Sequence, residues 1–131
     1  MYFHLKFIGI LLIALAIMHI FFSKYFNWKK ELSFLSLINK EMMIIHTFFI
    51  ALTILLMGLF CLTSTNEMIE TTLGRKIALG FAAFWFIRLL VQFFGYSSAL
   101  WRNKIFETFM HILFTVLWSY LSIIFFKIWL G

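Results

Sequence analysis

The chain of 131 residues has no proline, one cysteine and few charged residues. Without proline, no helix is expected to break midway, which argues against transporters that bind substrate at interrupted helices. Cys61 cannot form a disulfide within the chain and has no CxxC partner, so a thiol-redox enzyme is not expected. Charged residues make up only 12% of the chain, against about a quarter in soluble domains. This scarcity of charge excludes an ordinary soluble domain.

Apolar residues are abundant instead. Hydrophobic residues make up 64% of the chain, and the mean hydropathy is +1.02. Four long apolar segments cover residues 5–22, 42–62, 77–96 and 105–130. Each approaches or exceeds the ~20 residues that cross a hydrocarbon core. Lipid cannot satisfy backbone groups, so each should be a continuous α-helix. The sequence therefore predicts one all-α domain over residues 1–131, an integral membrane up-and-down four-helix bundle.

The positive residues of the connections predict an orientation. With four spans, the loops 23–41 and 97–104 share one side and carry six lysines and arginines, whereas the other side, with both termini, carries four. The excess places the two loops in the cytoplasm and the termini outside.

The first connection also has an amphipathic pattern. Trp28, Leu32 and Leu35 recur at helical spacing beside the charged residues Lys29 and Lys30. This pattern predicts an interfacial helix over 27–38 that lies along an anionic leaflet. The alternative is a solvated linker whose periodicity arises by chance. The formal net charge of +6 fits a membrane surface, and no nucleic-acid-binding motif is present.

Polar side chains inside the spans gather at one depth. With a rise of ~1.5 Å per residue, six of them lie within ~12 Å of the surface that bears the first connection. They come from all four segments: His19, His46, Arg88, Gln92, Glu107 and His111. Charged and imidazole groups in a membrane are expected to face the bundle interior.

Helical phase agrees with this depth. Arg88 and Gln92 are four residues apart, with Trp85 beside them, and Glu107 and His111 are also four apart. Residues at this spacing share a helix face. The sequence therefore predicts a polar site to which several helices contribute.

The first candidate chemistry for this site is haem or metal ligation. His46, His111 and His19 would be the ligands, and Glu107 would be a further ligand or an acceptor for one of them. A haem b group would need two facing histidines, and Arg88 could neutralise a propionate. No HxxxH or HExxH pair occurs on one helix, so the spacing gives no direct metal signature.

Two other functions fit the same residues. A quinone-like or anionic amphipathic ligand could be held by Arg88, Gln92, Trp85 and Glu107, with phenylalanines around its tail. Alternatively, Arg88 pairs with Glu107 and locks two helices, as in a structural subunit of a membrane complex or a homo-oligomer. No motif identifies a reaction, so the sequence does not decide whether the protein is an enzyme.

The chain resembles a family of small, uncharacterised bacterial four-helix membrane proteins. The resemblance lies in the order of three pieces, INKEMMIIHTFFIALTILLMGL, FWFIRLLVQFFGYSSALWR and FETFMHILFTVLW. It implies a bacterial inner-membrane protein and carries no activity.

Overall fold

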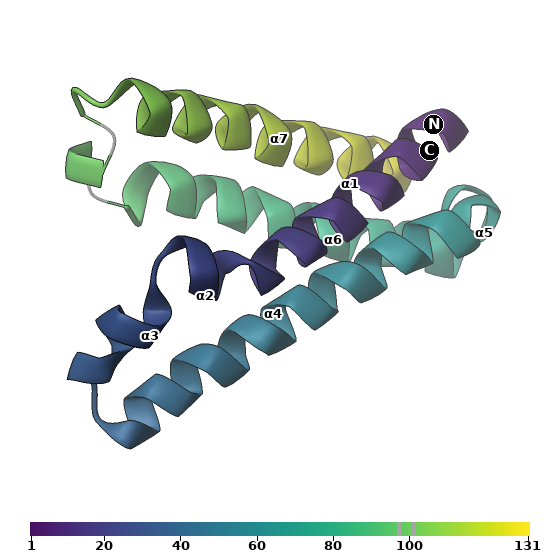
Figure 1. The fold of residues 1–131 in the computed structure, drawn as a ribbon. Coiled ribbons are helices and arrows are strands. Elements are labelled where there is room, and N and C mark those ends of the chain that lie inside the picture. Colours follow the sequence, from purple (N-terminus) through teal and green to yellow (C-terminus); the bar gives the residue numbers. More distant parts are fainter. Residues whose placement is uncertain (97, 101) are drawn as a thin grey trace. The chain divides into compact units, whose positions relative to one another are not determined.

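The computed structural model consists of helices joined by short turns (Figure 1). It describes residues 1–96, 98–100 and 102–131, and no strand occurs among them. The four long helices are α1 (Tyr2–Ile20), α4 (Leu37–Thr63), α6 (Thr72–Phe94) and α7 (Ile105–Leu130). The short ones are α2 (Phe22–Tyr25), α3 (Trp28–Glu31), η1 (Leu32–Phe34), α5 (Thr65–Glu70) and η2 (Ser98–Leu100). The prediction of an all-α chain is confirmed.

The four long helices are long and apolar enough to cross a membrane. Each overlaps one predicted segment, but α4 and α6 begin at Leu37 and Thr72, before the predicted 42 and 77. Ser36 and Thr71 explain the earlier starts, because their side chains accept hydrogen bonds from the first-turn amides of Asn39 and Gly74. These caps satisfy amides that would otherwise lack partners, so the helices extend past their apolar stretches.

The first connection differs from the predicted interfacial helix over 27–38. Two short elements, α3 and η1, take its place. Asn27 has a left-handed backbone with φ 53°, and Leu35 is extended with ψ 156°. Because Ser36 must also be extended to cap α4, the helix over 27–38 cannot run through residues 35 and 36. In the loop predicted at 97–104, Ser97 and Trp101 lie outside the described residues.

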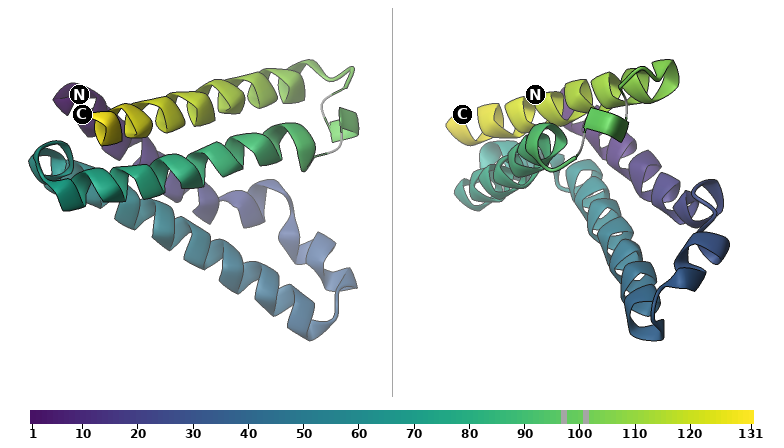
Figure 2. Two further views of the ribbon diagram at one scale, coloured as in Figure 1. Left: turned by 180° about the vertical axis from the view of Figure 1, so that it is seen from behind. Right: turned by 90° about the vertical axis from the view of Figure 1, so that its left-hand side faces the viewer.

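The chain divides into two compact units, which are residues 66–131 with Met1 and Tyr2, and residues 3–65. In the first unit, α6 and α7 lie side by side as an antiparallel pair (Figures 1 and 2). Their contacts occur in opposite order along the two helices, since Trp85 stacks on Trp118 and Phe81 packs edge-on against Phe125. This is the hairpin expected of consecutive spans. The four-helix bundle as a whole stays a prediction.

In the second unit, α1 and α4 approach each other very closely at two glycines. A Cβ atom added to Gly58 would lie 2.9 Å from the carbonyl oxygen of Gly9, and one added to Gly9 would lie 2.6 Å from Cγ of Leu62. Small residues let helix backbones come together in this way. Nearby, the Lys6 ammonium donates a 2.6 Å hydrogen bond to the Leu62 carbonyl oxygen. This bond engages an acceptor in the last turn of α4.

We expect Gly58→Ala to destabilise the protein by about 1–3 kcal/mol, because a methyl group against the Gly9 backbone must push α1 and α4 apart. The matched control is Gly80→Ala in α6, where a Cβ would meet no described atom within 4 Å. That exchange should leave stability equal or raise it, since alanine favours helices. Thermal unfolding in detergent, followed by circular dichroism, measures both. Equal midpoints for the two variants would contradict the close crossing.

Candidate functional site

The polar side chains of the first unit form a chain of hydrogen bonds from α6 to α7. The guanidinium Nη1 of Arg88 donates to Oε1 of Gln92 at 3.3 Å. Nε2 of Gln92 lies 3.0 Å from Nδ1 of His111 and 3.4 Å from the His111 carbonyl oxygen. The order Arg88, Gln92, His111 therefore joins the two helices through side chains. These are three of the six residues that the sequence predicted in one site.

The direction of these bonds follows from Arg88. A guanidinium can only donate, so the amide oxygen of Gln92 faces it and the amide nitrogen faces α7. Nδ1 of His111 must then accept, which places the imidazole proton on Nε2 in this arrangement. The Thr115 hydroxyl donates to the His111 carbonyl oxygen at 2.8 Å. The bonds from Arg88 to Gln92 and from Gln92 to His111 thus point from the cation toward α7, and the Thr115 bond lies within α7.

Aromatic rings surround the cation. The guanidinium carbon of Arg88 lies 5.1 Å from the Trp118 ring centre and 5.4 Å from that of Tyr96. Trp118 in turn stacks on Trp85 and Phe114, with centroid distances of 5.0 and 5.5 Å. Each cation–π contact contributes about 0.5–2 kcal/mol, with the larger values in desolvated sites. The ring faces therefore offset part of the cost of holding Arg88 in an apolar helix.

Arg88, Trp85 and Trp118 have N–H groups without an acceptor among the described residues. The indole Nε1–H groups of Trp85 and Trp118 are buried without a partner in that part of the chain, and the two side chains are only 1% and 4% exposed. Arg88 makes a single hydrogen bond to the described residues, although a guanidinium has five N–H groups. Buried donors without acceptors are rare and costly. The cluster is therefore suited to an oxygen-bearing or anionic partner.

The predicted ion pair between Arg88 and Glu107 does not form. Arg88 contacts Gln92, Tyr96 and Trp118, and Glu107 is exposed. The reason is the register of the hairpin. Because Gln92 lies opposite His111, Arg88 lies level with a position near 115, two helical turns or ~12 Å from Glu107. The charge of Arg88 is thus met by neutral groups within the described part of the chain.

The remaining histidines lie in the other unit. Nδ1 of His19 donates to the Leu15 carbonyl oxygen at 2.8 Å, and its ring packs against Phe22 at 4.6 Å. His46 is exposed. It makes none of the contacts that hold His19.

The described residues contain no group of three or more His, Cys, Asp or Glu side chains that could hold a metal ion. The predicted ligands belong to different units, His19 and His46 to one and His111 to the other. Ligation of a metal or haem by these histidines therefore stays a prediction.

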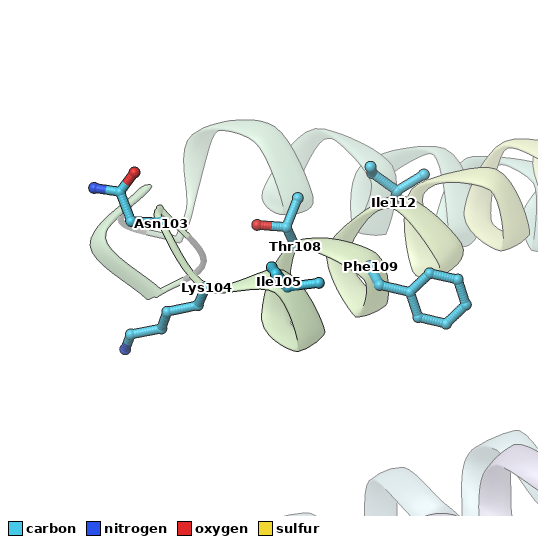
Figure 3. A pocket seen from close by; sticks show the side chains of 6 residues that line it. All are labelled: Asn103, Lys104, Ile105, Thr108, Phe109 and Ile112. Atoms are coloured by element: carbon cyan, nitrogen blue, oxygen red, sulfur yellow. The ribbon is translucent and has the colours of Figure 1, made fainter.

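A surface pocket of about 490 Å³ lies at the start of α7 (Figure 3). Its lining comes entirely from residues 103–112, and Ile105, Phe109 and Ile112 give it apolar walls. None of the predicted site residues lines it. With no wall from a second long helix, it offers no converging polar groups of the kind found around Arg88.

The contact between Tyr96 and Arg88 was not predicted from the sequence. Tyr96 lies eight residues beyond Arg88, just past the end of α6. That spacing could have suggested a ring two turns above the guanidinium.

We expect Gln92 and His111 to be energetically coupled by about 0.6 kcal/mol and at most ~1.7 kcal/mol, the range for hydrogen bonds between membrane helices. A double-mutant cycle with Gln92→Leu and His111→Leu, read from unfolding in mixed micelles, measures this coupling. Glu107→Gln combined with Gln92→Leu is the control and should be additive, because Glu107 is exposed. Additivity of the Gln92 and His111 changes would contradict the bond.

No protein-family model matches the chain, and neither the curated proteins nor the solved structures include a significant match to it. The resemblance to a bacterial four-helix family therefore stays a prediction, and the site has to be interpreted from its own geometry.

Proposed function

We propose that this is a small multi-pass membrane protein that binds the anionic head of an amphipathic molecule at Arg88, between α6 and α7. The head would be a carboxylate or a phosphate. Its apolar tail would lie along the lipid-facing phenylalanines of the same two helices. The proposal makes Arg88 a binding residue, and Gln92 and His111 the groups that hold it in place.

The observation that carries this proposal is the uncompensated donor cluster. Arg88 faces a neutral amide and two aromatic rings rather than a carboxylate. The buried indole N–H groups of Trp85 and Trp118 are two more donors that lack an acceptor among residues 1–96, 98–100 and 102–131. A site that only stabilised the fold would be expected to include a counter-ion or further acceptors.

The energies favour an anionic partner. A central arginine costs roughly 2.5–3.5 kcal/mol on insertion scales. The ring contacts and the hydrogen bond to Gln92 offset part of that cost. A carboxylate or phosphate would add paired, charge-assisted hydrogen bonds, for which the planar guanidinium fork is well shaped.

The apolar surroundings suit a tail. Several phenylalanines of the two helices are exposed, including Phe84, Phe93 and Phe94 on α6 and Phe106 and Phe109 on α7. Exposed aromatic side chains on spanning helices contact lipid, so a bound chain would meet them without new desolvation.

The bond from Gln92 to His111 supports a second candidate function. It links α6 to α7 directly, so the cluster could serve as a clamp in a structural subunit of a membrane complex. In that case Arg88 would contribute to stability and not to ligand binding.

We expect the protein to prefer oleate over oleyl alcohol, which has the same tail and no charge. Arg88→Gln should weaken oleate binding about 10-fold or more, as expected for loss of a hydrogen bond to a charged group. It should leave oleyl alcohol binding unchanged. Arg88→Lys should recover only part of the affinity, because an ammonium lacks the bidentate fork. Native mass spectrometry from a non-ionic detergent measures the bound fractions.

The matched control is Arg75→Gln, which removes the other arginine of α6 at its opposite end. This variant should bind oleate like the parent protein. Equal affinity for both ligands, or oleate binding that Arg88→Gln does not change in a folded protein, would refute the proposal. A lower unfolding midpoint with unchanged binding would favour the structural clamp.

A further inference from the structure

The second unit contains a pocket of about 390 Å³ that none of the functions above uses. It lies among the end of α1, the short elements α2, α3 and η1, and the first half of α4. Figures 1 and 2 show α1 and α4 separating from each other toward α2 and α3. The pocket occupies this wider part of the unit, away from the close glycine crossing.

The lining is divided by chemistry. The basic side chains are Lys29 from α3 and Lys40 from the first turns of α4. The apolar part includes Leu32, Ile44 and Phe48. This division resembles the polar head and the apolar chain of a lipid.

Three further polar side chains lie among the lining residues. The Thr47 hydroxyl, on α4, donates to the Met43 carbonyl oxygen at 2.8 Å. Ser23 contributes a hydroxyl from α2. The His19 ring is held by its hydrogen bond to the Leu15 carbonyl oxygen and by its packing on Phe22. With Lys29 and Lys40, five polar side chains from four different helices therefore line one pocket.

The charge of the lining has one sign. Lys29 and Lys40 have no acidic counterpart among the lining residues, although Glu31 and Glu41 are close in sequence. Lys40 is half-buried, as is Trp28, which also lines the pocket. Lys29 is exposed. Lysines beside a tryptophan are typical of the headgroup region of a bilayer.

The position of the pocket along the helices also suits a lipid. The pocket lies where α1 ends and α4 begins, so it would sit at the boundary between headgroups and acyl chains. From Lys40 to Ala51, the lining residues of α4 span ~16 Å along the helix. That length runs from the charged rim into the apolar part of the helix.

We propose that this pocket binds one anionic phospholipid, with its phosphate between Lys29 and Lys40 and the upper part of one acyl chain against Ile44, Phe48 and Ala51. The site is separate from the one at Arg88, and neither proposal depends on the other. The phospholipid would hold α2 and α3 against the end of the helix pair.

The test uses the full chain in nanodiscs that contain phosphatidylglycerol and phosphatidylcholine, with retained lipid measured by native mass spectrometry. We expect the protein to keep phosphatidylglycerol. The double variant Lys29→Gln/Lys40→Gln should lower its retention about 25-fold, since each lysine near an anionic lipid contributes about fivefold in affinity. The matched control, Lys24→Gln/Lys30→Gln, removes the same charge from the same connection at positions that do not line the pocket. It should retain the lipid.

A steric variant tests the acyl part without changing charge. Ala51→Trp should fill the apolar end of the pocket and displace the lipid, whereas Thr53→Trp, on an exposed position of α4, should not. Inorganic phosphate at millimolar concentration should not compete, because it lacks the chain.

Three results would overturn the proposal. The first is an equal loss of phosphatidylglycerol in the Lys29→Gln/Lys40→Gln and Lys24→Gln/Lys30→Gln variants. The second is unchanged retention in a folded Ala51→Trp variant, and the third is displacement of the lipid by inorganic phosphate. Arg88→Gln should leave phosphatidylglycerol retention unchanged, so failure here is distinguishable from failure of the function proposed for Arg88.

Discussion

The contact on which the α6–α7 pair depends is the bond between Gln92 and His111. It fixes which residues of the two helices lie opposite each other. From that register follow the stacking of Trp85 on Trp118 and the position of Arg88 over the Trp118 ring. A shift by one turn would separate all three contacts. The polar bond and the aromatic stack therefore specify the same alignment, and such agreement between interactions is typical of a well-defined hairpin.

The two units solve the packing of apolar helices in different ways. In α6 and α7, large rings fill the space between the backbones, and polar groups are added to that layer. In α1 and α4, glycines remove side chains so that the backbones meet, and Lys6 adds a bond to the end of the helix. In a membrane, neither solution would rely on the hydrophobic effect, which gives no driving force between helices in lipid.

The all-α class and the four long helices could be predicted from the sequence, because apolar length alone identifies helices that are long enough to cross a membrane. The grouping of Arg88, Gln92 and His111 followed from helical phase and the antiparallel order of segments. The pairing of Arg88 with Glu107 could not be judged in this way, because depth along separate helices does not give the register between them. The first connection was also predicted wrongly as one helix, since the periodicity of Trp28 and Leu32 does not reveal that the chain must become extended to cap α4 at Ser36.

The close approach of Gly9 and Gly58 has a mechanical consequence for the second unit. The two backbones meet there, flanked by the side chains of Leu62 and Ile13, so a rotation of α4 against α1 would turn about this point. Ile44 lies 14 residues from Gly58 along α4, or ~21 Å at the usual rise. A tilt of about three degrees at the pivot would thus move that end of the helix by ~1 Å. Because this part of α4 is long, a small change in helix angle would measurably widen or narrow the pocket that Ile44 lines.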